Sequence, residues 1–242
     1  MNRRLFLYTS TLSLLSLSKD LWAYDLQSAY TLEELTGKKR PPLFGKGFNL
    51  RKEVAHAFEQ MQQEARKEGI RLYSVSSYRS FDRQKAIWNA KYRKYTLQGL
   101  APLQAIEKII QYSTIPGTSR HHWGTDLDII DLSRKTPHDP LDEKHFIGGT
   151  YDTLYRWLQK NASRFGFYET YTNNAQRKGF NFEPWHYSYA DTAKKMMTEF
   201  LKIDLQEFLK NTDVLGGGLF TEELILKYRN ENILGINDLL IS

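Results

Sequence analysis

The sequence predicts a single domain of the α+β class. Its 242 residues, of which 40% are hydrophobic and 14% aromatic, can build one substantial core but are few for two. Long amphipathic patterns with helical spacing occur together with short apolar runs that are typical of strands. Helices packed around a small sheet are therefore expected.

The first half of the chain contains three helical patterns and one strand pattern. A helix is expected over about 49–68 because its apolar residues recur on one stripe, and a strand is expected over 70–76. Ser80 can cap the next helix, over about 81–95. A further helical pattern covers 102–112.

The second half supplies the central strand and the covering helices. Residues 127–132 read as the central strand, and 151–165 as an amphipathic helix closed by a glycine. A last long helix, about 191–210, is expected to cover the sheet. Beyond a run of three glycines, a short helix capped by Thr221 is expected to end near Asn230.

The N-terminus predicts export. Arg3 and Arg4 precede the largely apolar run 5–17, which is too short for a membrane span but suits the hydrophobic region of an export signal. We expect a signal peptide over 1–23, a connector over 24–48, and a mature chain without a stable membrane span in the periplasm or cell envelope. The paired arginines also resemble a twin-arginine signal, so this export route stays open.

The composition narrows the choice of partners. A net charge of +6 suits an anionic surface such as a bacterial wall, and it would also suit nucleic acid. No basic block resembles a nucleic-acid arm, so nucleic acid is not an expected partner. Cysteine is absent, which excludes disulfides and thiolate zinc sites.

Two short segments have the residues of a metal site. His121 and Asp128 are seven apart, so they would face opposite sides of an extended chain unless it bends, and Gly124 between them permits a bend. In the second segment, Glu183 and His186 can share a pocket only if the chain turns at the intervening proline. Two imidazoles and one carboxylate suit a catalytic zinc with an open position, one ion per chain. Glu183, which is not itself a ligand in this scheme, is then placed to act as the base.

At these residues the sequence resembles a known family. Ser119-x-His121-x-x-Gly124-x-Asp126-x-Asp128 resembles the Ser-x-His-x-x-Gly-x-Ala-x-Asp signature of the zinc peptidases grouped as lysostaphin, D-Ala-D-Ala peptidase and Sonic hedgehog. The run from Glu183 to His186 is similar to their second signature. The box from Ser77 to Ser80, followed by Gln84, resembles that of the VanY-like D-alanyl-D-alanine carboxypeptidases.

The resemblance covers about residues 44–190 and implies both a fold and an activity. It implies a small, mostly antiparallel sheet that bears the zinc site. With the last expected helix included, the peptidase domain is expected over 49–210, and 211–242, which lies outside the resemblance, is a tail of unknown role. It implies a zinc-dependent carboxypeptidase that trims peptidoglycan stem peptides, with L,D-carboxypeptidase or D,D-endopeptidase activity as alternatives. A zinc-containing domain that binds the wall without cleaving it is a further alternative.

The resemblance also assigns roles to individual residues. It implies His121, Asp128 and His186 as zinc ligands and Glu183 as the catalytic base. A fixed cation beside such a pocket can bind a substrate carboxylate or an oxyanion, so Arg79 is expected to be catalytic. The residues expected to orient the substrate are Ser119, Gln84 and Tyr78.

One position departs from the family pattern. Asp126 stands where the family usually has alanine, two residues before the expected ligand Asp128. Alternate residues of a strand face the same side. Asp126 could therefore compete as a ligand or add negative charge near the metal.

Overall fold

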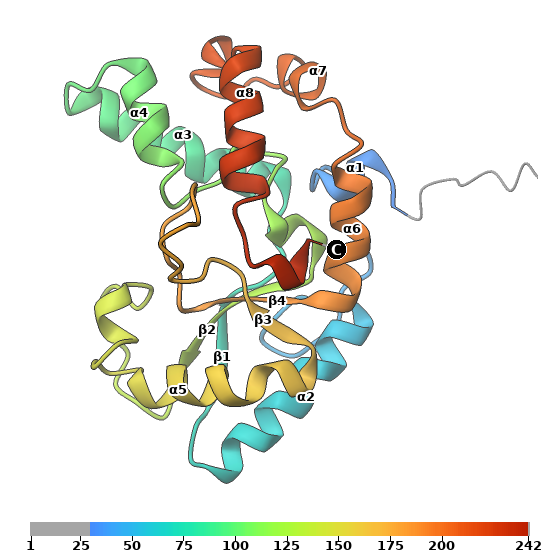
Figure 1. The fold of residues 1–242 in the computed structure, drawn as a ribbon, viewed down its shortest axis with the longest axis vertical. Coiled ribbons are helices and arrows are strands. Elements are labelled where there is room, and N and C mark those ends of the chain that lie inside the picture. Colours follow the sequence, from blue (N-terminus) through green and yellow to red (C-terminus); the bar gives the residue numbers. More distant parts are fainter. Residues whose placement is uncertain (1–29, 242) are drawn as a thin grey trace, which may run out of the picture.

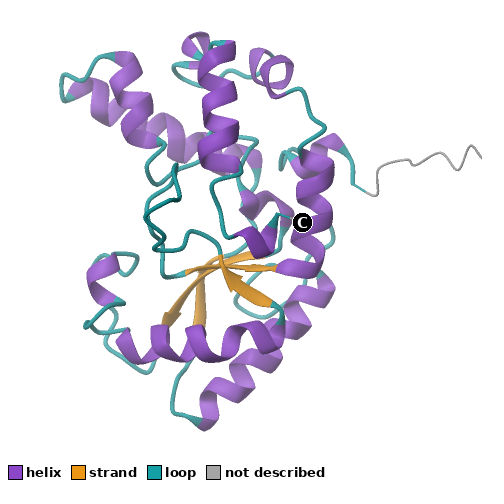
Figure 2. Ribbon diagram, in the orientation of Figure 1, coloured by secondary structure: helices purple, strands orange, loops and turns teal. Residues whose placement is uncertain are grey.

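The computed structural model describes residues 30–241 (Figure 1). The expected signal peptide over 1–23 and the first residues of the expected connector lie outside the described residues. The described chain forms two layers of helices with a small sheet between them (Figures 1 and 2).

The sheet has four antiparallel strands in the order β1-β2-β4-β3, which confirms the predicted small antiparallel sheet. The strands are β1 (Leu72–Ser76), β2 (Asp126–Asp131), β3 (Phe167–Glu169) and β4 (His186–Tyr189). All six residues of β2 are buried, as expected of a central strand. The pairing of β1 with β2 is irregular between Ser74 and Ser76, immediately before the chain leaves the sheet toward Arg79.

Two long helices cover one face of the sheet. They are α2 (Lys52–Lys67) and α5 (Asp152–Asn161), the latter continued by a 3-10 turn over Ala162–Phe165. Their apolar stripes join the side chains of β2 and β4 in one core, which contains Val54, Phe58, Met61, Leu127, Ile129, Leu154, Trp157, Leu158 and Tyr187. This core fixes the sheet from below in the view of Figure 1.

The remaining helices and the end of the chain form a second core above the sheet. Its helices are α1 (Leu32–Leu35), α3 (Phe81–Leu97), α4 (Pro102–Ile109), α6 (Ala190–Phe200), α7 (Leu205–Lys210) and α8 (Glu222–Tyr228), with short helical turns over Arg120–Trp123, Gly217–Leu219, Arg229–Ile233 and Asp238–Leu240. A further turn, Glu143–His145, precedes Phe146, which is buried in the first core. Residues after 210 are integral to this core, because Phe220, Ile225, Tyr228, Ile233 and Leu240 are all buried in it.

The expectation of one continuous helix over 191–210 is wrong. The chain forms α6 and α7 separately because Asp204 adopts an extended conformation and its side chain accepts a hydrogen bond from the backbone N–H of Glu207. This capping interaction begins a new helix, so Asp204 cannot also continue the old one. The break lets α7 leave the direction of α6 and pack beside α8.

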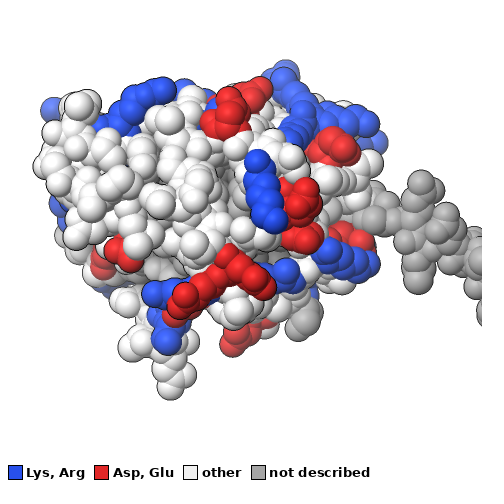
Figure 3. Space-filling model, turned by 90° about the horizontal axis from the view of Figure 1, so that it is seen from above, with Lys and Arg blue, Asp and Glu red and all other residues white. Residues whose placement is uncertain are grey.

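The outer surface carries charges of both signs. In the face shown in Figure 3, basic and acidic side chains of the described residues lie side by side around a largely uncharged centre. None of the helices within residues 30–241 combines the length and the apolar character of a membrane span.

Candidate active site

The antiparallel pairing of β2 with β4 brings the two signature segments together. Asp128 on β2 lies directly opposite His186 on β4. His121 lies on the 3-10 turn before β2, and Gly124 ends this turn with a φ of 69°. That left-handed conformation is natural for glycine. The bend predicted at Gly124 is therefore present, and it places His121 beside Asp128.

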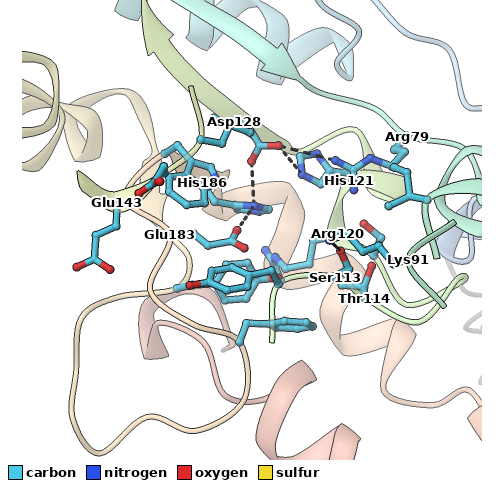
Figure 4. A pocket seen from close by; sticks show the side chains of 18 of the residues that line it. Arg79, Lys91, Ser113, Thr114, Arg120, His121, Asp128, Glu143, Glu183 and His186 are labelled. Atoms are coloured by element: carbon cyan, nitrogen blue, oxygen red, sulfur yellow. Dashed lines mark hydrogen bonds and ion pairs between the residues drawn. The ribbon is translucent and has the colours of Figure 1, made fainter. Parts of the chain in front are cut away.

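Three buried side chains converge on one point (Figure 4). The Nε2 atom of His121 is 3.3 Å from Oδ2 of Asp128, and Nδ1 of His186 is 3.2 Å from Oδ1 of Asp128. One nitrogen or oxygen atom from each of these residues lies within 4.8 Å of the others. The three expected metal ligands are thus brought together.

The hydrogen bond on the far side of the His121 imidazole shows how this group fits a cation. Nδ1 of His121 lies 2.7 Å from the carbonyl oxygen of Ser77, which can only accept, so Nδ1 carries the hydrogen and Nε2 offers a lone pair. Burial, with Arg79 nearby, also lowers the pKa of His121 and favours the neutral ring. Oδ1 of Asp128 is buried without a hydrogen-bond partner among residues 30–241. Acceptors that face one another need a cation between them, and two imidazoles with a carboxylate suit zinc.

Glu183 lies beside this group but outside it. As predicted, the chain turns at Pro184, and the backbone N–H of His186 donates to the carbonyl of Glu183 at 3.0 Å. The turn places Oε2 of Glu183 3.4 Å from Nδ1 of His186 (Figure 4). Burial raises the pKa of the Glu183 carboxyl. A buried carboxylate next to an open metal position can accept a proton from water there.

Arg79 is held firmly at the edge of the site. Its Nη1 donates to Oε1 of Gln84 at 2.8 Å, and its Nη2 donates to Oγ of Ser76 at 2.8 Å. Nη2 is also 3.8 Å from Oδ2 of Asp128. Gln84 in turn donates to the carbonyl of Thr114. Gln84 therefore lies behind Arg79 and fixes it.

His122 is a supporting residue that the sequence did not single out. Its Nδ1 donates to the carbonyl oxygen of Arg79 at 2.6 Å, and its Nε2 accepts from the backbone N–H of Gly117. Burial lowers its pKa to about 3, so the ring is neutral. Its packing is tight, because a Cβ on Gly37 would lie 2.3 Å from Nδ1. His122 thus anchors the backbone of Arg79.

The site opens into a cavity of about 570 Å³. Ser119 lines it, whereas Tyr78 does not; the Tyr78 ring instead lies 6.0 Å from the guanidinium of Arg40. Lys91 on α3 also lines the cavity and donates from Nζ to Oγ of Ser113 at 2.5 Å. Further lining residues that the motifs did not indicate are Tyr171, Phe180, Asp139, Asp142 and Glu143.

Asp126 is not part of the converging group. Its carboxylate accepts hydrogen bonds from Arg120, His186, Thr125 and Ser188. These four contacts occupy the lone pairs of both oxygens. The geometry therefore selects Asp128, and not Asp126, as the carboxylate of the group.

A small sheet that holds two imidazoles and a carboxylate, with a second carboxylate beside an open cavity, has the groups that the site of a metal-dependent hydrolase requires. The family model for VanY, D-alanyl-D-alanine carboxypeptidase, matches residues 47–192, which is more than half of the chain. The chain belongs to this family.

Individual relatives agree with this assignment. The chain is 32% identical to the Bacillus subtilis (strain 168) protein YodJ over 162 residues, covering 66% of this chain and 54% of YodJ. It is 31% identical over 150 residues to a D-alanyl-D-alanine carboxypeptidase of Enterococcus faecalis (strain ATCC 700802 / V583), covering 62% of this chain and 51% of the relative. The chain therefore spans about half the length of these two proteins.

A solved structure shares the fold. It is a crystal structure of a mutant of the vancomycin resistance D,D-pentapeptidase VanY from a VanB-type resistance cassette, in complex with Zn(II). The similarity has a TM-score of 0.50 with 26% sequence identity and covers 69% of this chain and 87% of that one.

Proposed function

We propose that this protein is a zinc-dependent D-alanyl-D-alanine carboxypeptidase that trims peptidoglycan stem peptides. The observation that carries the proposal is the position of Glu183, buried and 3.4 Å from His186 but outside the group formed by His121, Asp128 and His186. A metal that served structure alone would not need a free carboxylate at this place. Membership of the VanY family and the Zn(II) in the VanY crystal structure support the choice of metal and reaction.

In this proposal His121, Asp128 and His186 hold one zinc ion. When bound, zinc supplies Lewis acidity, which polarises a carbonyl and makes water a nucleophile near neutral pH. Glu183 takes a proton from the attacking water and delivers it to the leaving amine. Glu183 is 7% exposed and lines the cavity, so it is placed to meet a water molecule that enters there.

The substrate's terminal carboxylate is placed by the cationic side of the cavity. Arg79 and Lys91 lie together on this side, while Glu143 lies across the cavity from them (Figure 4). A terminal carboxylate is attracted by the two cations and repelled by the acidic rim, so the peptide enters with its C-terminus toward Arg79. Ser119, which lines the same cavity, is available to hydrogen-bond the peptide.

We further propose that the protein acts outside the cytoplasm, in the periplasm or cell envelope, because its proposed substrate is part of the cell wall. The apolar run after Arg3 and Arg4 supports an export signal over 1–23. The paired arginines leave the twin-arginine route open, and a reporter fusion in a strain lacking that translocase would test it.

Mass spectrometry of defined muropeptides tests the enzymatic proposal. The zinc-loaded protein should remove one residue from a pentapeptide stem ending in D-Ala-D-Ala and leave the tetrapeptide intact. Converting the terminal carboxylate to an amide should slow the reaction, because Arg79 and Lys91 lose their partner.

Three other outcomes would replace the proposal. Shortening of the tetrapeptide would identify an L,D-carboxypeptidase, and cleaved cross-links alone would identify an endopeptidase. Binding of wall fragments without any cleavage would identify a non-catalytic wall-binding domain.

A further inference from the structure

Asp126 occupies a position that the ligand set does not explain. It is completely buried on β2, two residues before Asp128, and pairs across the sheet with Ser188 on β4. The usual residue of the family signature at this point is alanine. A buried carboxylate is costly unless its oxygens are hydrogen-bonded and its charge is paired, so a specific arrangement must compensate for it here.

Resting on the zinc site of the proposed function, we propose that Asp126 is a positioning residue that fixes His186 with Nδ1 toward the metal. Oδ1 of Asp126 lies 3.0 Å from Nε2 of His186, on the side of the ring away from Asp128. A carboxylate only accepts hydrogen bonds, so Nε2 must carry the hydrogen. Nδ1, which faces Asp128 and Glu183, is left with the lone pair that a metal requires.

Arg120 compensates for the cost of burying the charged carboxylate of Asp126. Its Nε donates to Oδ1 of Asp126 at 2.9 Å, and its Nη2 donates to Oγ of Ser188 at 2.7 Å. Ser188 then donates to Oδ2 of Asp126 at 3.0 Å. Asp126 and Arg120 together add no net charge to the site. The pair therefore orients His186 without changing the balance of charge that the zinc experiences.

Arg120 is itself held in place for this purpose. Its guanidinium carbon lies 4.8 Å from the centre of the Trp123 ring, and both residues are buried. Stacking on the ring restrains the side chain that must meet Asp126. The turn over Arg120–Trp123 thus supplies one ligand, His121, and also the cation that secures the orientation of the other, His186.

Partners of this kind, which hydrogen-bond the far nitrogen of a ligating histidine, commonly affect metal affinity by about 10- to 100-fold. Asp126→Asn keeps the size of the side chain but removes its charge, so that Nε2 of His186 faces at most a neutral, weaker acceptor. We expect zinc affinity, measured by competition with a chromophoric chelator, to fall by about 10- to 100-fold. Asp131→Asn is the matched control, because Asp131 is also buried on β2 but bonds Arg71 and Ser133 instead of a histidine.

Zinc affinity of Asp126→Asn equal to that of the wild type, or an equal loss in Asp131→Asn, would overturn the inference. Neither outcome would affect the proposed function, which requires only that the wild type bind zinc and cleave. A wild type that fails to bind zinc would contradict the proposed function itself.

A second measurement needs no variant. Long-range ¹H–¹⁵N correlation spectra of the zinc-loaded wild type should show His186 with its hydrogen on Nε2 and the metal on Nδ1. His121 should show the opposite pattern, with its hydrogen on Nδ1. A hydrogen on Nδ1 of His186 would refute the role of Asp126 even if Asp126→Asn failed to fold.

Discussion

Glu169 gives the protein a pH-dependent stability that a single substitution should remove. It lies on β3, beside the strand that carries His186, and only 8% of the residue is exposed. Burial raises its pKa from an ordinary value of 4.5 to about 7, and the polar groups of Tyr155 and Gln159 offset this only in part. Its Oε1 has no hydrogen-bond partner among residues 30–241.

The sign follows from proton binding. Between pH 4.5 and 7 the folded state keeps a proton on Glu169 that the unfolded chain has lost, so stability falls as pH rises through this window. A pKa difference of about 2.5, at about 1.36 kcal/mol per pH unit, corresponds to about 3 kcal/mol in total. Most of it, about 2 to 3 kcal/mol, should be lost between pH 5 and pH 8.

Glu169→Gln should remain neutral at every pH and so escape this loss. Urea unfolding of zinc-loaded wild type and variant at several pH values gives the difference in the free energy of unfolding, in which other titrating groups cancel. Between pH 5 and pH 8, the free energy of unfolding of the variant should rise by about 2 to 3 kcal/mol relative to that of the wild type. Glu107→Gln, which changes an exposed glutamate, is the control and should show no such gain. Parallel curves for wild type and Glu169→Gln would refute the reasoning.

Two further predictions concern the cavity and the end of the chain. Arg79→Lys should lower kcat/KM for peptides with a free terminal carboxylate by roughly 10- to 150-fold, because a charged hydrogen bond contributes about 1.5–3 kcal/mol, and should change hydrolysis of amidated peptides less. The exposed Arg83→Lys should have no such effect, and an equal loss on both substrates would contradict the carboxylate-binding role. Tyr228→Phe removes a hydroxyl bonded to the backbone N–H of Ile115 and to Thr118, so chemical denaturation should show a loss of about 1–3 kcal/mol. Tyr73→Phe, which changes a partly exposed ring on β1, is its control. Equal stability of the two variants would show that the Tyr228 hydroxyl does not stabilise the fold.

The site was predictable from the sequence wherever a single residue determines the local backbone conformation. Gly124 permits a left-handed backbone conformation and Pro184 restricts the backbone, and both segments have the predicted bend or turn. Once these are fixed, the pairing of Asp128 with His186 follows from the antiparallel sheet. The α+β class was predicted mainly from the family resemblance, and the helical and strand periods of the apolar residues supported it.

Contacts between distant segments could not be read in the same way. Lys91 lies within a helix of 17 residues, and its spacing does not distinguish a lysine over a cavity from one in solvent. His121 and His122 are adjacent and of the same type, so the direction in which each ring points depends on the turn that contains them. The apolar residues keep a helical spacing across Asp204, so the spacing alone does not show that the capping hydrogen bond of Asp204 ends one helix and begins another.

The packing of residues after 210 was the least accessible feature. This segment lies outside the family signatures, and nothing in its composition names its partners. In the structure Tyr228 reaches the loop before Ser119, and Asn232 donates to the carbonyl of Ile110. Residues after 210 therefore support the segment just before Ser119, which lines the cavity.

The central claim is that a zinc ion and Glu183 together perform peptide hydrolysis. Glu183→Gln keeps the shape of the side chain but cannot accept the proton of the attacking water. Zinc content and D-Ala release should be measured on the same preparations of wild type and variant. General-base assistance contributes about 100- to 10,000-fold, so the variant should retain one zinc per chain and lose at least about two decades of turnover. Equal turnover in the two proteins, or loss of zinc together with activity, would contradict the account.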